Sequence, residues 1–290
     1  MDLQLGLLLG ITAMAFWGVS DFISAVVSKR IGSFMTFFMA RIIGVALLAV
    51  LLVFFYRSAT YSPLTILLII VAGGINFAST LIYYKGFAIG EASIISPVAA
   101  SYPVITVLLG VFLLKEQISV LQVAAIILII IGSISASFRL KDILHYRTKK
   151  LAKGIKYGLT ASALWGVMVF LIGVLSNTIG WYMPVLLVDA IGLLLAFPAY
   201  KIYKMKLSAP PASVLIIVLL CIALSVGNVL GWFAYDLGTT VSYISVVAAV
   251  SSVYPIITVL LSRIILKERI SANQVAGIFL VLLALVILAF

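Results

Sequence analysis

The sequence predicts an all-α, polytopic membrane protein with ten transmembrane helices, arranged as two inverted five-helix repeats. Of its 290 residues 65% are hydrophobic and 9% are charged, which is more apolar surface than one soluble core can bury. Apolar runs of about twenty residues recur along the chain, the length a helix needs to cross roughly 30 Å of hydrocarbon. The second half of the chain also repeats motifs of the first half.

The apolar runs place the membrane-spanning helices in order. The first run lacks the basic start of a signal peptide and is followed by further runs, so we expect it to be a helix of the mature protein. The predicted spans are 3–27, 34–55, 64–84, 92–114, 119–138, 154–175, 182–200, 213–235, 243–265 and 271–289.

Basic residues lie in the gaps between these runs and account for the formal charge of +11. They are spread over short connections rather than gathered in one patch, so we expect no nucleic-acid partner. The odd-numbered connections carry most of them, above all the one spanning 139–156. The positive-inside rule therefore predicts a cytoplasmic central connection, both termini outside, and a location in the cell membrane, either inner or plasma.

Two segments of the chain repeat at fixed offsets. SYPVITVLLGVFLLKEQISVLQVA, from Ser101, matches VYPIITVLLSRIILKERISANQVA, from Val253, 152 positions later. AFWGV, from Ala15, matches ALWGV, from Ala163, 148 positions later. We expect one five-helix repeat over 1–138, a basic connecting loop over 139–153 and a second repeat over 154–290. An odd number of helices inverts the second repeat, and inverted repeats form their binding site near the midplane.

Three short motifs occur once in each half. They are the A-x-W-G tetrads ending at Gly18 and Gly166, the Y-P pairs Tyr102–Pro103 and Tyr254–Pro255, and the K-E pairs Lys115–Glu116 and Lys267–Glu268. In these motifs the chain resembles the EamA-type ten-helix members of the drug/metabolite transporter superfamily. The resemblance implies an alternating-access carrier whose cavity is lined by the first, third and fourth helices of each half. It does not name the substrate.

Polar and aromatic residues form a stripe on the third helix and on its repeat, the eighth. Their spacing of i, i+3, i+4 and i+7 puts each set on one helix face. Such a stripe either lines a cavity or bonds neighbouring helices, and the large aromatics favour the cavity. With the tetrad tryptophans, the Y-P tyrosines and Asp21, the predicted substrate-binding residues are Trp17, Asp21, Asn76, Ser79, Tyr83, Tyr102, Trp165, Asn228, Trp232, Tyr235 and Tyr254.

Charged residues inside the spans are costly and are therefore candidates for function. Asp21 and Arg41 lie at similar depth, so an ion pair between them is feasible; an Asp21 facing the cavity would instead attract an amino group or exchange a proton. Asp189 occupies the repeat position of Arg41, but inversion puts the two near opposite surfaces, so we expect no direct contact. We assign Arg41 and Asp189 to gating or charge pairing, and expect Asp236, near a helix end, to be solvated.

Prolines and the K-E pairs mark helix irregularities. Pro97 and Pro103 should interrupt the fourth helix and Pro255 the ninth, as hinges or as static kinks. We expect the K-E pairs to cap helix N-termini at the membrane interface.

The residue content argues against an enzyme. The sole histidine, His145, lies in the central connection, and the sole cysteine, Cys221, lies in an apolar run, so we predict no catalytic residue, no metal and no cofactor. We predict a carrier that exports small metabolites such as amino acids or aromatic compounds, as a monomer or weak homodimer in the lipid bilayer. The alternatives are a carrier for sugars or phosphorylated metabolites and a membrane scaffold without transport activity.

Overall fold

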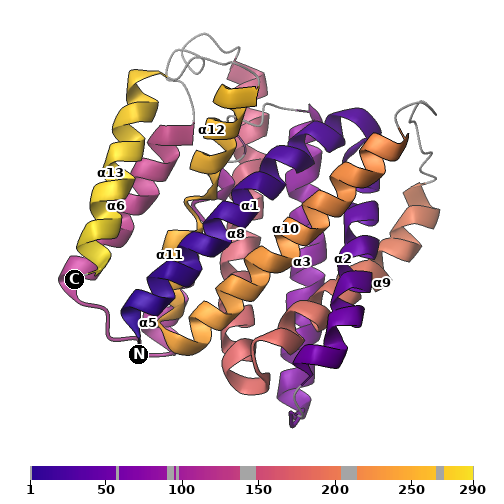
Figure 1. The fold of residues 1–290 in the computed structure, drawn as a ribbon, viewed down its shortest axis with the longest axis horizontal. Coiled ribbons are helices and arrows are strands. Elements are labelled where there is room, and N and C mark those ends of the chain that lie inside the picture. Colours follow the sequence, from indigo (N-terminus) through magenta and orange to yellow (C-terminus); the bar gives the residue numbers. More distant parts are fainter. Residues whose placement is uncertain are drawn as a thin grey trace.

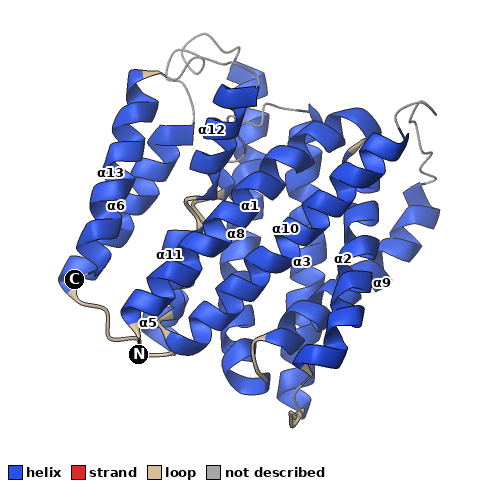
Figure 2. Cartoon of the chain, in the orientation of Figure 1, coloured by secondary structure: helices blue, strands red, loops and turns tan. Residues whose placement is uncertain are grey.

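The structure is a computed structural model that describes residues 2–56, 59–89, 95, 98–137, 148–203, 214–265 and 271–289. Within these residues the regular structure is entirely helical (Figure 2). Six helices are long and apolar enough to cross a membrane, and four shorter apolar helical segments complete ten spans. The predicted all-α, ten-helix membrane fold is therefore confirmed.

The helices follow the repeat. The first half contains α1 Leu3–Ile31, α2 Ser33–Phe55, α3 Pro63–Ile89, α5 Pro103–Leu113 and α6 Val120–Ser137. The second half contains α8 Thr148–Ile179, α9 Tyr182–Tyr203, α10 Val214–Val241, α11 Ile244–Ser251, α12 Tyr254–Ile265 and α13 Ala272–Ala289.

Several helices are longer than the apolar runs that predicted them. Helix α8 begins at Thr148, inside the segment expected to be a loop, and α10 continues to Val241. Hydropathy marks the part of a helix that lies in hydrocarbon, whereas backbone hydrogen bonding continues into polar residues at either end. The remainder of the central connection, residues 138–147 with His145, lies outside the described residues.

Two tight turns are built on matching glycines. Gly32, between α1 and α2, has φ of +81°, and Gly180, between α8 and α9, has φ of +84°. An L side chain is strained in this region, whereas glycine is not. The two positions correspond in the repeat, so both halves reverse direction after their first helix in the same way.

Helix breaks occur at the Y-P motifs. Helix α11 ends at Ser251 and α12 starts at Tyr254, with Pro255 as its second residue. In the first half a turn over 100–102 precedes α5, which starts at Pro103. The carbonyl of Ala248, which accepts from the backbone N–H of Ser252 at 3.1 Å, also accepts a hydrogen bond from the Tyr102 hydroxyl of the other half at 3.4 Å. Pro97 lies outside the described residues.

The two halves pack through equivalent elements. The first helix of each half lies along the third helix of the other, α1 on α10 and α8 on α3, while α2 packs on α9. Helices α6 and α13 lie side by side at one edge, and both chain ends lie at the same end of the bundle (Figure 1). The termini thus lie together, as expected for an even number of spans.

Glu116 caps a helix of the opposite half rather than the helix that follows it. Its carboxylate accepts hydrogen bonds from the backbone N–H groups of Ile244, at 2.9 Å, and Ser245, at 3.3 Å, and from the Ser245 hydroxyl. These groups form the N-terminus of α11, where a carboxylate satisfies free donors and opposes the helix dipole. Lys267 and Glu268 lie outside the described residues.

This cap predicts a measurable stability loss. Glu116→Ala should lower the free energy of unfolding in detergent by about 1–2 kcal/mol, since it leaves two α11 donors without their acceptor. Glu116→Gln, which keeps one acceptor oxygen, should lose less, and Lys115→Ala, at the exposed neighbouring position, should change little. Equal stability of Glu116→Ala and the unaltered protein would show that the contact does not contribute.

Candidate substrate-binding site

A cavity lies between the two halves, with Arg41 at its wall close to the middle of α2. Side chains from α1, α2, α3, α8, α9, α10 and α12 line it, together with Tyr102 at the start of α5. Its volume is about 130 Å³. An engineered cavity of roughly 150 Å³ holds benzene, so this space suits a small metabolite.

Most of the predicted substrate-binding residues line this cavity. They are Trp17, Asp21, Asn76, Tyr83, Tyr102, Trp165, Asn228, Trp232 and Tyr254, and Arg41 and Asp189 lie there too. Ser79 and Tyr235 are fully buried behind the wall. The Ser79 hydroxyl donates to the carbonyl of Asn76 at 3.1 Å, and the Tyr235 hydroxyl donates to the carbonyl of Val169 at 3.3 Å. These two residues therefore support the cavity wall.

Aromatic rings of the two halves cross at the cavity. Trp17 of α1 stacks on Tyr235 of α10 with ring centroids 5.7 Å apart, and Trp165 of α8 contacts Tyr83 of α3 at 4.6 Å. The two contacts correspond in the repeat. Trp17 also meets Trp232 edge-on at 4.8 Å. Each tetrad tryptophan thus packs on the third helix of the opposite half.

The tetrad glycines explain why the A-x-W-G and Y-P motifs occur together. A Cβ at Gly18 would lie 2.6 Å from the carbonyl oxygen of Tyr254, and one at Gly166 would lie 2.7 Å from that of Tyr102. Thr258 donates to the Gly18 carbonyl at 3.1 Å and Thr106 to the Gly166 carbonyl at 2.9 Å. The two motifs are contact partners across the halves.

Asp21 is 8% exposed and lies at the cavity wall. Its carboxylate accepts hydrogen bonds from the Tyr83 hydroxyl at 2.8 Å and from the Thr258 hydroxyl at 3.2 Å. Hydrogen bonds from hydroxyl groups to a carboxylate fix its position and orientation. The Asp21 carboxyl group is therefore held in place at the cavity wall.

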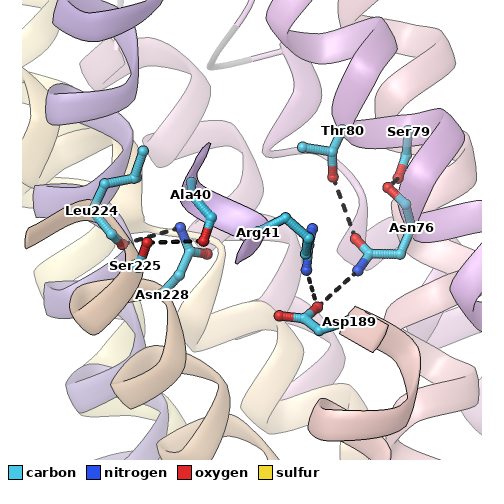
Figure 3. A network of polar contacts seen from close by, with 9 residues as sticks. All are labelled: Ala40, Arg41, Asn76, Ser79, Thr80, Asp189, Leu224, Ser225 and Asn228. Carbon is cyan, nitrogen blue, oxygen red and sulfur yellow. Dashed lines mark hydrogen bonds and ion pairs between the residues drawn. The ribbon is translucent and has the colours of Figure 1, made fainter. Parts of the chain in front are cut away.

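Arg41 and Asp189 form a direct ion pair, so the expectation that they would not meet is wrong (Figure 3). The Asn76 amide also donates to Asp189, at 3.3 Å. Both charged residues lie a few residues from the centres of α2 and α9, which pack against each other. Because α2 and α9 pack against each other near their centres, the long Arg41 side chain reaches Asp189.

Asp236 is also placed differently from the expectation. It is completely buried rather than solvated. The apolar run ends at about residue 235, but α10 continues to Val241 and packs on α1, α8 and α11 at this level.

The sequence reasoning missed several cavity residues. Ser20 and Ser24 line the cavity beside Trp17 and Asp21 on α1. They lie three and seven residues after Trp17, so the helical spacing applied to α3 would have found them. Ser225 of α10, which also lines the cavity, donates to the carbonyl of Ala40 at 2.9 Å and so joins α10 to α2 (Figure 3). This contact joins the two halves, and no residue spacing in the sequence predicts it.

Comparison with known proteins agrees with this architecture. The profile of the EamA-like transporter family matches residues 4–138 and again residues 152–290. An uncharacterized protein of Methanocaldococcus jannaschii is 30% identical over 138 residues, which are 45% of this chain and 95% of that protein. A crystal structure of a protein with 16% identity superimposes with a TM-score of 0.74 over 97% of this chain and 95% of that one, which shows the same fold. The chain therefore belongs to the EamA-like transporter family, within the drug/metabolite transporter superfamily, and is a multi-pass membrane transporter.

Proposed function

We propose that this transporter is an alternating-access carrier in the inner or plasma membrane that exports small amphipathic metabolites, with amino acids and aromatic compounds as the leading class. The observation that carries the proposal is the aromatic, acidic cavity between the halves. Among the described residues its lining combines three tryptophan and four tyrosine rings with Asp21, Asp189 and Arg41. Such a site offers stacking surfaces together with a few placed polar groups.

The charges of the lining favour a substrate with a positively charged nitrogen. Arg41 is paired with Asp189, and the described lining residues include a second acidic side chain, that of Asp21. Aromatic faces also attract cations. The indole N–H of Trp17 is buried without a hydrogen-bond partner among the described residues, and is a donor for a substrate oxygen. An ammonium group beside Asp21 and an oxygen at Trp17 match an amino acid.

Phosphorylated metabolites are the weaker alternative. A dianionic phosphate would need several basic side chains, and over the described residues Arg41 is the single basic group in the lining. An uncharged sugar fits the stacking surfaces but has no positively charged nitrogen to place beside the Asp21 carboxyl group.

Ligand-induced thermal stabilisation of the purified protein tests this proposal. At a ligand concentration of 100 times Kd, binding to the folded state should add about 2.7 kcal/mol of stability. We expect amino acids or aromatic amines to stabilise the protein and sugars or phosphates not to. The shift should disappear in Trp232→Ala, in the cavity, and persist in Trp181→Ala, whose indole packs on Phe55 and Phe233 instead. Stabilisation confined to sugars or phosphates would overturn the substrate class.

A further inference from the structure

Asp236 of α10 is a third buried acid among the described residues, after Asp21 and Asp189, and it is separate from the substrate cavity. Its side chain is 0% exposed and is not among the described residues that line the cavity. Both of its carboxylate oxygens lack a hydrogen-bond partner within the described part of the chain. The nearby hydroxyl of Ser176, on α8, is likewise buried without a partner of ordinary hydrogen-bond geometry.

Within the described part of the chain, the elements around Asp236 provide no counter-charge. On α9 the charged group acting on it is Asp189, itself an acid that is already paired with Arg41. Helix α1 from Leu3 to Phe16 and helix α11 contain no acidic, basic or histidine residue. On α8, Ser176 is the polar group beside it, and on α10 its neighbour Tyr235 donates its hydroxyl to Val169. Two further acids lie at this end of the bundle: Glu116 is bound to the N-terminus of α11, and Asp2 is exposed and caps α1.

An ionised carboxylate in this position would be expensive. Transferring it from water without a hydrogen bond or a cation is strongly unfavourable, whereas the protonated acid is uncharged and far less costly to bury. A metal cation would need about six oxygen ligands, but over the described residues Ser176 is the side-chain hydroxyl that acts on the Asp236 carboxyl group. Among the described residues there is no group of three histidine, cysteine or acidic side chains that could hold a metal. The site therefore suits a proton.

The repeat provides an internal comparison. At the 152-residue offset Asp236 corresponds to Tyr84, and at the 148-residue offset Ser176 corresponds to Ser28. The serine is present and buried in both halves, but the acid is present in the second half alone. Packing therefore does not require a carboxyl group at this position. Because the repeats are inverted, the acid lies towards one side of the membrane, and the equivalent position towards the other side holds a tyrosine instead.

The position of Asp236 connects the substrate cavity with the surface. Trp232, which lines the cavity, lies one helical turn before Asp236 on the same face of α10. In the other direction α10 ends at Val241, about 7.5 Å further along the helix axis. A movement of α10 that rearranges the cavity would thus also move Asp236 relative to α8 and to water at this end of the bundle.

We propose that Asp236 is a proton-binding site that couples this carrier to a proton gradient. In the conformation described here the carboxyl group holds the proton, and it releases the proton to water when α8 and α10 separate at the end near Val241. No other bond forms or breaks. The coupling rests on the proposed transport function, but the protonated state of Asp236 does not.

Infrared spectroscopy of the purified protein tests the protonated state independently of transport. The unaltered protein should show the C=O stretch of a protonated carboxyl at neutral pH, and Asp236→Asn should lose it. Asp2→Asn, at the exposed start of α1, should keep it. Asp236→Glu should keep such a band at a shifted frequency, and gives the answer if Asp236→Asn does not fold. Absence of a protonated carboxyl in the unaltered protein would overturn the proposal.

Proteoliposomes test the coupling. We expect transport of the ligand identified by thermal stabilisation to be accelerated several-fold by a pH gradient in the unaltered protein and in Asp236→Glu. Asp236→Asn should bind the same ligand but show no response to the gradient. A response to sodium rather than to pH that disappears in Asp236→Asn would overturn the proton in favour of a cation. If no ligand is bound or transported while the infrared band is present, the proposed function fails and the proton site stands.

Discussion

Arg41→Met should lower the free energy of unfolding by about 3–5 kcal/mol, the largest loss expected for any single change in this protein. The substitution leaves the Asp189 carboxylate at the centre of the bundle with the Asn76 amide as its remaining described partner. A buried charge that has lost its partner lowers the free energy of unfolding strongly. The intact ion pair, by contrast, adds little stability when it is compared with apolar residues at the same two positions. Denaturant unfolding in detergent micelles, followed by the helical signal, measures the loss.

The double variant Arg41→Met with Asp189→Leu separates the pair from its surroundings. It removes both charges together, so stability should return to within about 1–2 kcal/mol of the unaltered protein. If the double variant were as unstable as Arg41→Met alone, packing around the Arg41 side chain would be the cause. Asp2→Asn, which changes an exposed acid, controls for a general effect of net charge.

Gly18→Ala and Gly166→Ala should each destabilise the protein by about 1–3 kcal/mol and slow transport. The new methyl group would lie 2.6 Å from the Tyr254 carbonyl oxygen in the first variant and 2.7 Å from the Tyr102 carbonyl oxygen in the second. Backbone atoms cannot rotate aside as a flexible side chain can. The helices must therefore separate, which disturbs the contact between the tetrad of one half and the Y-P break of the other.

Gly74→Ala is the matched control. Gly74 lies in the middle of α3, and a Cβ there would meet nothing within 4 Å. Replacing a helical glycine with alanine in open space should raise stability by about 0.5–1 kcal/mol. Equal stability of Gly18→Ala and Gly74→Ala would refute the assignment of the tetrad glycine to close helix packing. Thermal unfolding and transport assays on the three variants measure both effects.

The architecture can be predicted from the sequence because the sequence shows both the apolar runs and the internal repeat that produce it. Lipid requires continuous apolar helices, so run length predicts spans, and the repeat offsets predict that the second half resembles the first. The stripe on α3 was predictable for the same reason: the spacing of Asn76 and Tyr83 fixes a shared helix face, and the structure places both at the cavity.

The sequence by itself determined where each helix lies in the chain, which helices of the two halves correspond, and which residues share a helix face. These features depend on local periodicity and on the repeat. The tertiary structure alone decided which residues meet across the halves. Arg41 reaches Asp189 because α2 and α9 pack against each other near their centres. Glu116 caps a helix 128 residues away, and Asp236 is buried because α10 continues past its apolar run. Contacts between elements depend on depth, crossing point and side-chain reach, and no spacing along one chain segment encodes them.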